Sequence, residues 1–254
     1  MSARRQEGMR AAIESAGYTL GLLARAALLS RSSWKKRAEI LSQSTVCGFG
    51  AFPVAMVVGA FTGMVLALQA GITLKTWGQE ALIGVVVPAS MVREMGPVMT
   101  AFILAGLVGS TMAAEIGTMA VSEEIDALEV MSINPVYYLV MPRVLALSFV
   151  TPVLTLYVDV VGILGGAFVG DRLLGLTYAE YMRNTLDTLD LKDIYSGLFK
   201  AFLFGALISS VGCAQGLRAT GGAEGVGRAT MRTVVICFVY ILIFDYILTW
   251  LFYH

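Results

Sequence analysis

Charged side chains interrupt apolar runs at four places in this 254-residue chain: Arg93, Glu94, Lys200 and Asp245. A charge at the centre of a membrane helix costs roughly 2.5–3.5 kcal/mol on insertion scales, so such groups face a bundle interior, a cavity or one another. Two interpretations follow. The four residues line a polar site for a charged group of a substrate, or Lys200 pairs with Glu94 or Asp245 only to neutralise charge. For a fifth residue, Asp159, a local hydrogen bond and a functional role are equally open.

A second candidate site is the segment 121–135, VSEEIDALEVMSINP. It predicts a short helix at about 121–132, with Ser122 as the N-cap and Pro135 beyond its end. Apolar residues at intervals of three form one narrow stripe: Ile125, Leu128 and Met131. The opposite face is acidic and comprises Glu123, Glu124, Asp126 and Glu129. Such a helix is too short to cross a membrane.

The elements that position these residues are predicted to be membrane-spanning helices. The chain is 57% hydrophobic and only 14% charged, against about 25% charged residues in soluble domains. Apolar runs of about 20 residues predict five spans. Four are placed at roughly 46–71, 143–170, 194–216 and 233–253, and the second begins either near Leu82 or at Pro97.

Two spans carry a small residue at every fourth position, which predicts helices packed closely along those faces. The first stripe is Ala101, Ala105, Gly109, Ala113 and Gly117, and the second is Gly197, Ala201, Gly205, Ser209 and Cys213. Gly59 and Gly63 in the first span predict another close helix approach. A glycine-rich linker is expected at 216–232.

The distribution of basic residues predicts the topology. Eight of the 18 Lys and Arg residues precede position 38, which places the N-terminus in the cytoplasm. Five spans then place the acidic helix and the 216–232 linker in the cytoplasm and the C-terminus outside. Residues 1–42 are predicted to form an amphipathic interfacial helix, with Trp34 at the headgroups, and residues 43–254 a five-span core. The whole chain is expected to be one domain.

Several kinds of chemistry are disfavoured. The three cysteines share no motif spacing and the only histidine is His254, so neither a disulfide nor a metal site is expected. The chain contains no GxxxxGK[ST] motif, so ATP work belongs to another chain. No nucleophile–base constellation is found, so an enzyme is disfavoured. Zero net charge gives no reason to expect a nucleic-acid partner, and the N-terminus does not resemble a signal peptide.

Three segments in order resemble the MlaE family of ABC-type permeases, the membrane subunits of systems with MCE (mammalian cell entry) domain proteins. They are REMGPVMTAFILAGLVGSTMAAEIGTM, SEEIDALEVMSINPVYYLVMPRVLA, and GGAEGVGRATMRTVV followed by FDYILTWLF. The family pattern EQIDALE is present with Glu124 in place of glutamine. The resemblance covers nearly all of the chain after residue 40.

The resemblance implies a homodimeric permease in a bacterial inner membrane that moves phospholipid or a related lipid. It implies three kinds of partner: a separate ABC ATPase that binds ATP and Mg²⁺, a periplasmic MCE-domain protein, and a small regulatory subunit on the ATPase. This chain itself would bind no cofactor. The acidic helix would be the coupling helix, which binds the ATPase through Glu123, Glu124, Ile125, Asp126, Leu128 and Glu129.

The lipid cavity would have a charged rim and an apolar wall. The rim is Arg93, Glu94, Lys200 and Asp245, and the wall includes Met64, Leu68, Val98 and Phe102. Two other function classes remain open on the residues alone. One is a secondary transporter in which Glu94, Lys200 and Asp245 relay protons. The other is a membrane scaffold in which the buried charges only fix the register of the helices.

Overall fold

A computed structural model describes residues 17–26, 28 and 36–254. Five helical stretches in it are long and apolar enough to cross a membrane: Arg37–Thr76, Glu80–Val121, Val136–Leu174, Leu191–Leu217 and Gly222–Tyr253. The described residues contain no β-strand. The all-α fold with five spans is therefore confirmed.

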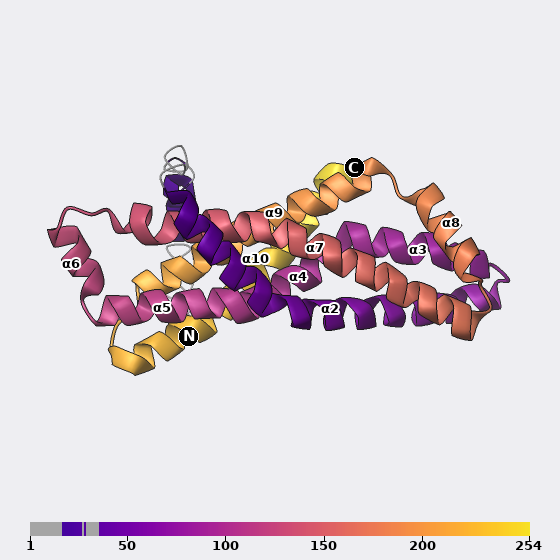
Figure 1. Ribbon diagram of the computed structural model, residues 1–254, viewed down its shortest axis with the longest axis horizontal. Helices are drawn as coiled ribbons and strands as arrows, with labels where there is room; N and C mark the ends of the chain where they lie inside the picture. The colour runs from indigo at the N-terminus through magenta and orange to yellow at the C-terminus, as the bar shows by residue number, and fades with distance from the viewer. Residues whose placement is uncertain (1–16, 27, 29–35) are drawn as a thin grey trace, which may run out of the picture. The chain divides into compact units, whose positions relative to one another are not determined.

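The helical elements follow one another with short connections (Figure 1). In chain order they are α2 (Arg37–Thr76), η2 (Glu80–Leu82), α3 (Ile83–Ser90), η3 (Met91–Met95), α4 (Gly96–Leu104), η4 (Ala105–Gly109), α5 (Ser110–Val121), α6 (Glu124–Val130), η5 (Val136–Val140), α7 (Met141–Val169), η6 (Gly170–Leu174), α8 (Tyr178–Thr188), α9 (Leu191–Leu217) and α10 (Gly222–Tyr253). η2 is a 3₁₀ turn, and the other η elements are π-helical turns.

The second span begins near the earlier of the two predicted starts. Its helical stretch runs from Glu80 to Val121, so Arg93 and Glu94 lie inside the helix rather than before it. They occupy η3, a single π-helical turn between α3 and α4. π-helical turns within α-helices frequently occur at functional sites, because the wider turn redirects side chains and a carbonyl group.

The chain divides into two compact units. One comprises Gly48–Leu104, Phe149–Phe204 and Ile241–His254, and we call it the Lys200 unit. The other comprises the described residues up to Cys47 together with Ala105–Ser148 and Gly205–Tyr240, and we call it the α6 unit. Each candidate site lies within a single unit.

The predicted close approach in the first span is present within the Lys200 unit. α2 packs side by side with α7, with Gly59 against Val158 and Gly63 against the backbone of Gly162. A Cβ atom on Gly63 would overlap the Gly162 carbonyl oxygen, so only glycine permits this approach. In lipid, such backbone proximity stabilises helix pairs through close packing.

The two small-residue stripes are buried along their whole length. In the α6 unit the first stripe packs closely against α9: a Cβ atom on Gly212 would lie 2.8 Å from the Gly109 carbonyl oxygen, and one on Gly216 would lie 3.0 Å from that of Ala113. In the Lys200 unit, Gly197 lies against the Val92 carbonyl. The prediction of closely packed helices is therefore confirmed.

Three local predictions were wrong. Ser122 is not an N-cap: it follows the last residue of α5, and its hydroxyl donates to the Thr118 carbonyl (2.9 Å). The residue before α6 is Glu123, in the left-handed region with φ 59°. Met131 is exposed, so the apolar stripe of α6 ends at Leu128. The glycine-rich linker is mostly helix, because α10 already begins at Gly222.

The predicted N-terminal helix is only partly described. Residues 17–26 are helical and bury Thr19, Leu22 and Ala26. Trp34 and the first 16 residues lie outside the described residues. The interfacial position of the segment stays a prediction.

We expect Gly63→Ala to destabilise the protein, because the added methyl group must push α2 away from Gly162. Overpacking of this kind costs about 1–3 kcal/mol. Gly50→Ala is the matched control, since Gly50 lies in the same helix and a Cβ atom there would meet open space. Thermal unfolding in lipid nanodiscs measures both. Equal melting temperatures for the two variants would contradict the role of the Gly63–Gly162 contact.

Candidate functional site

Lys200 lies at the centre of a buried polar cluster in the Lys200 unit. Its side chain is 0% exposed. The ammonium donates to Glu94 Oε2 (2.8 Å) and to Asp245 Oδ1 (3.0 Å). It also contacts the Arg93 carbonyl oxygen (3.1 Å) and Thr249 Oγ1 (2.7 Å). Three elements that are distant in sequence, η3, α9 and α10, therefore meet at one nitrogen atom.

This arrangement satisfies both predicted pairings at once. The ammonium has three protons and four oxygen acceptors around it, so its donors are used within the protein. Thr249 links the two carboxyl-bearing helices further, because its hydroxyl lies 2.8 Å from both Glu94 Oε1 and the Asp245 carbonyl oxygen. Removal of one charged member of this cluster is costly, because it leaves an opposite charge buried without compensation.

The π-helical turn η3 explains how one segment supplies two acceptors. Arg93 and Glu94 are consecutive, yet the carbonyl of the first and the carboxylate of the second both reach Lys200. η3 ends at Met95, and the N–H of the next residue, Gly96, donates to the Met91 carbonyl. Gly96 is itself pressed against the side chain of Asp159 on α7, where a Cβ atom would not fit.

The Arg93 side chain takes part in a second network rather than in the Lys200 cluster. Its Nη2 donates to Asp193 Oδ2 (2.8 Å), and Asp193 Oδ1 accepts a hydrogen bond from the Tyr253 hydroxyl (2.9 Å). Ser196 completes the network at 2.9 Å from the same hydroxyl. The guanidinium also lies 5.1 Å from the centroid of the Tyr253 ring. Unlike Lys200, the Arg93 side chain is 39% exposed.

The predicted apolar wall is less closely tied to this cluster. Val98 is buried in α4, and Phe102 is half-buried one turn later. Met64 on α2 lies beside Gly165 of α7, and Leu68 is 40% exposed. Contact of these four side chains with a substrate stays a prediction.

Four residues of the two networks were missed in the sequence: Asp193, Ser196, Thr249 and Tyr253. Thr249 had a usable signal, since it follows Asp245 by four residues and so shares its helix face. Asp193 precedes the predicted start of the fourth span at residue 194, whereas α9 begins at Leu191. Because α9 starts three residues earlier than predicted, Asp193 belongs to the helix and lies within reach of Arg93.

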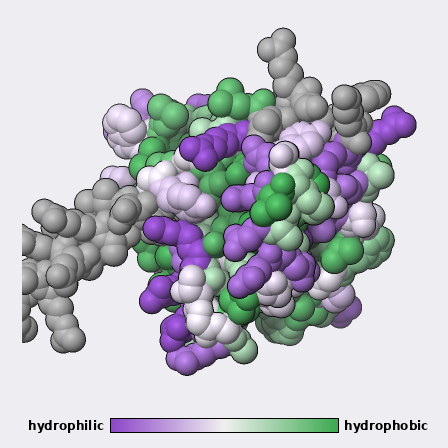
Figure 2. All heavy atoms as spheres, turned by 90° about the vertical axis from the view of Figure 1, so that its left-hand side faces the viewer, coloured by the Kyte–Doolittle hydropathy of each residue, from purple (hydrophilic) through white to green (hydrophobic). Residues whose placement is uncertain are grey.

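The acidic helix α6 forms the second candidate site, in the α6 unit. Ile125 is buried in a cluster with Ile116, Val140 and Cys213, and Leu128 packs against the same cluster. The acidic side chains are exposed: Glu123, Glu124, Asp126 and Glu129. α6 is therefore anchored by its apolar face and presents its carboxylates outward. Viewed from the side where α6 lies, the surface mixes hydrophilic and hydrophobic side chains (Figure 2).

The flanking helices of α6 are fastened to each other. Arg143 of α7 donates to Glu115 Oε2 of α5 (3.0 Å) and to the Leu139 carbonyl (3.1 Å). Val130, at the end of α6, is 86% exposed, and Met131 follows it. Two apolar side chains thus extend outward next to the acidic face.

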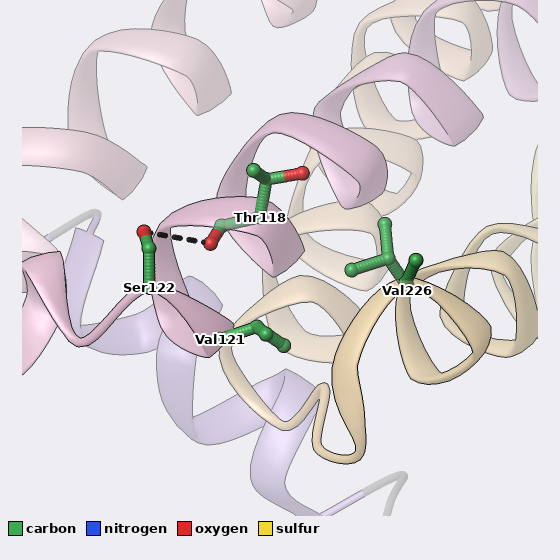
Figure 3. Close-up of a pocket in the computed structure, with 5 residues that line it drawn as sticks. Thr118, Val121, Ser122 and Val226 are labelled. Carbon is green, nitrogen blue, oxygen red and sulfur yellow. Dashed lines mark hydrogen bonds between the residues drawn. The ribbon is translucent and has the colours of Figure 1, made fainter.

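A pocket of about 440 Å³ opens where α5 ends and α10 begins (Figure 3). It is lined by Thr118, Val121, Ser122, Ala223 and Val226. The hydrogen bond from the Ser122 hydroxyl to Thr118 forms part of its wall. The lining side chains are small and mostly apolar.

We expect Lys200→Met to destabilise the protein strongly, by about 3–5 kcal/mol, because Glu94 and Asp245 would lose their shared cation. The triple variant Lys200→Met, Glu94→Gln, Asp245→Asn should recover most of this loss, since no uncompensated charge remains. Lys75→Met, at an exposed position of α2, is the control. Thermal unfolding in nanodiscs measures all three. A triple variant no more stable than the single one would rule out charge balance as the cause.

Comparisons with known proteins agree with this architecture. Residues 40–251 match the family described as Permease MlaE. A probable ABC transporter permease protein of Rickettsia conorii is 42% identical over 214 residues, 84% of this chain and 83% of the relative. A probable ABC transporter permease protein of Synechocystis is 38% identical, over 85% of this chain and 82% of the relative. The protein TRIGALACTOSYLDIACYLGLYCEROL 1, chloroplastic, of Arabidopsis thaliana is 35% identical, over 89% of this chain and 64% of the relative. The chain therefore belongs to the MlaE family of ABC transporter permeases.

Proposed function

We propose that this permease moves phospholipid or a related lipid between a bacterial inner membrane and a periplasmic MCE-domain partner, driven by a separate ABC ATPase. The observation that carries the proposal is α6, a helix anchored by Ile125 that presents a row of exposed carboxylates. Such a surface fits a basic groove on a partner that hydrolyses ATP. The chain has no phosphate-binding loop of its own, so ATP and Mg²⁺ belong to that partner.

The two cations of the Lys200 unit support different roles in lipid binding. Lys200 is fully buried and its donors are used within the protein, so it holds the site together. Arg93 is partly exposed and contacts one carboxylate oxygen through Nη2, whereas its Nε is buried. The exposed part of a guanidinium can donate to phosphate oxygens. Arg93 is therefore the group that meets a lipid phosphate.

The lipid class rests on the surroundings of this cation and on one relative. Large apolar side chains are exposed on α9 and α10 within the same unit, among them Phe199, Ile247 and Leu251. Acyl chains are the ligands that such surfaces accept. The name of the Arabidopsis relative includes the word trigalactosyldiacylglycerol, which denotes a galactolipid. The acyl chains would lie along Met64, Leu68, Val98 and Phe102.

The assembly is completed by the remaining partners. We infer a homodimer with a small regulatory subunit on the ATPase, and a cytoplasmic position of the N-terminus and of α6. The basic N-terminal segment supports this orientation through the excess of Lys and Arg on the cytoplasmic side. The C-terminus would then be periplasmic.

The driving force separates this function from proton-coupled transport. The permease, reconstituted with its ATPase in proteoliposomes, should transfer fluorescent phospholipid only when ATP is hydrolysed. Transport driven by a pH gradient without an ATPase would instead support a proton relay through Glu94, Lys200 and Asp245. Lipid extracted from the purified complex and identified by mass spectrometry names the substrate.

Charge reversal on α6 tests the coupling role. We expect Glu124→Lys, Asp126→Lys to abolish co-purification with the ATPase and ATP-driven transport. Two exposed positive charges would then replace carboxylates and repel the basic surface of the ATPase. The single variant Asp126→Lys should weaken both, and Asp187→Lys, an equally exposed reversal on α8, should leave both unchanged. Undiminished binding and transport by the double variant would refute the coupling role of α6.

A further inference from the structure

Besides Arg93 Nε and Tyr181 Oη, three buried polar atoms of the Lys200 unit make no hydrogen bond to the described part of the chain, and these three lie on α4 or α7. They are Thr100 Oγ1, Thr155 Oγ1 and Asp159 Oδ1. Their residues are 0%, 0% and 6% exposed. A buried hydroxyl or carboxyl oxygen without a partner costs about 1–3 kcal/mol, so three on one pair of helices require an explanation.

The two threonines differ from the other buried hydroxyl residues whose bonds are known. Ser and Thr side chains in helices usually donate to the carbonyl three or four residues earlier. The following buried residues do so: Ser148, Thr185, Ser196, Ser209, Ser210 and Thr233. Thr100 and Thr155 leave this local acceptor unused, so both hydroxyl groups remain available to another partner.

The register between α3–α4 and α7 places the three groups together. As the residue numbers of the contacts rise along α3–α4, those of their partners on α7 fall, so the two stretches are antiparallel. The contacts are Val87 with Gly166, Met91 with Gly162, and Gly96 with Asp159.

Extended by one further helical turn, this register would bring Thr100 opposite Thr155. Thr100 follows Gly96 by four residues on α4, and Thr155 precedes Asp159 by four residues on α7. Residues four apart share a helix face, with their Cβ atoms about 5–6 Å apart. One small ligand between the helices therefore lies within reach of all three oxygen atoms.

We propose that Thr100, Thr155 and Asp159 form a binding site for an ordered water molecule between α4 and α7. A buried water makes about three hydrogen bonds to otherwise unsatisfied polar groups, which is the number available here. A proton on Asp159 alone would leave both hydroxyl groups without a partner. The site is independent of the lipid and ATPase partners.

The position of the site gives it a role in holding the Arg93–Glu94 turn. Asp159 presses on Gly96, the residue that follows η3. The water fixes the Asp159 carboxyl group against this glycine and so supports the turn that supplies two acceptors to Lys200. The three residues are positioning residues and do not contact the substrate.

Replacement of both threonines by valine decides whether water is bound. Valine has nearly the shape of threonine, so in a dry interface Thr100→Val, Thr155→Val would remove two unsatisfied hydroxyl groups and raise the melting temperature. With bound water, the variant loses two partners, and the melting temperature should fall by about 4 °C or more. Thr233→Val is the control, because that buried hydroxyl already bonds to Ala229. The full chain in lipid nanodiscs is the sample.

Two further measurements separate water from a cation and from simple space filling. Asp159→Asn should retain the melting temperature while Asp159→Leu lowers it, because only the amide still bonds to water. Exchange of sodium for choline should change nothing, whereas sodium-dependent stability would replace the water with a monovalent cation and overturn the proposal. If the variants fail to fold, an electron cryomicroscopy map of the wild-type protein that resolves ordered waters decides. A map without density between Thr100 and Thr155 would also overturn it.

Discussion

One buried ammonium organises the Lys200 unit. The hydrocarbon interior offers no water to a charged group, so Lys200 is stable there only with acceptors supplied by the protein. These come from η3 and α10, while the lysine itself belongs to α9. The π-helical turn follows from the same need, because it directs the Arg93 carbonyl and the Glu94 carboxylate toward one atom. A displacement of any of the three elements therefore breaks a charge-assisted hydrogen bond.

The meeting of Arg93–Glu94, Lys200 and Asp245 could be predicted because helices have a constant rise. Equal distances along neighbouring spans place charges at equal depth, so sequence counting was enough to group them. The spacing of small residues in the second span likewise predicted a close helix approach, which Gly109 makes to Gly212 of α9. The Asp193–Tyr253 network could not be found in this way, because it depends on where α9 starts and α10 ends. Such boundaries are decided by packing rather than by composition.

The error at Ser122 has a related cause. Serine before an acidic run is the usual sign of an N-cap. Here α5 continues to Val121, and its last turn uses the Ser122 hydroxyl, so the chain must turn at Glu123 with a left-handed backbone. The conformational strain of that backbone is offset, because the turn lets Ile125 and Leu128 pack into the apolar cluster against α6. The burial of two apolar side chains thus outweighs a local capping preference.

The contacts that η3 and α4 make on their two sides differ in how readily they can break and re-form. Toward α9 and α10, the contacts are ionic and saturated, and separation of the elements would expose an uncompensated charge. Toward α7, the polar groups are hydroxyl and carboxyl oxygens that the protein leaves unbonded, and a bound water exchanges its partners at little cost. A movement of the Arg93–Glu94 turn during transport is therefore expected to proceed by a shift against α7, with η3, α9 and α10 moving together.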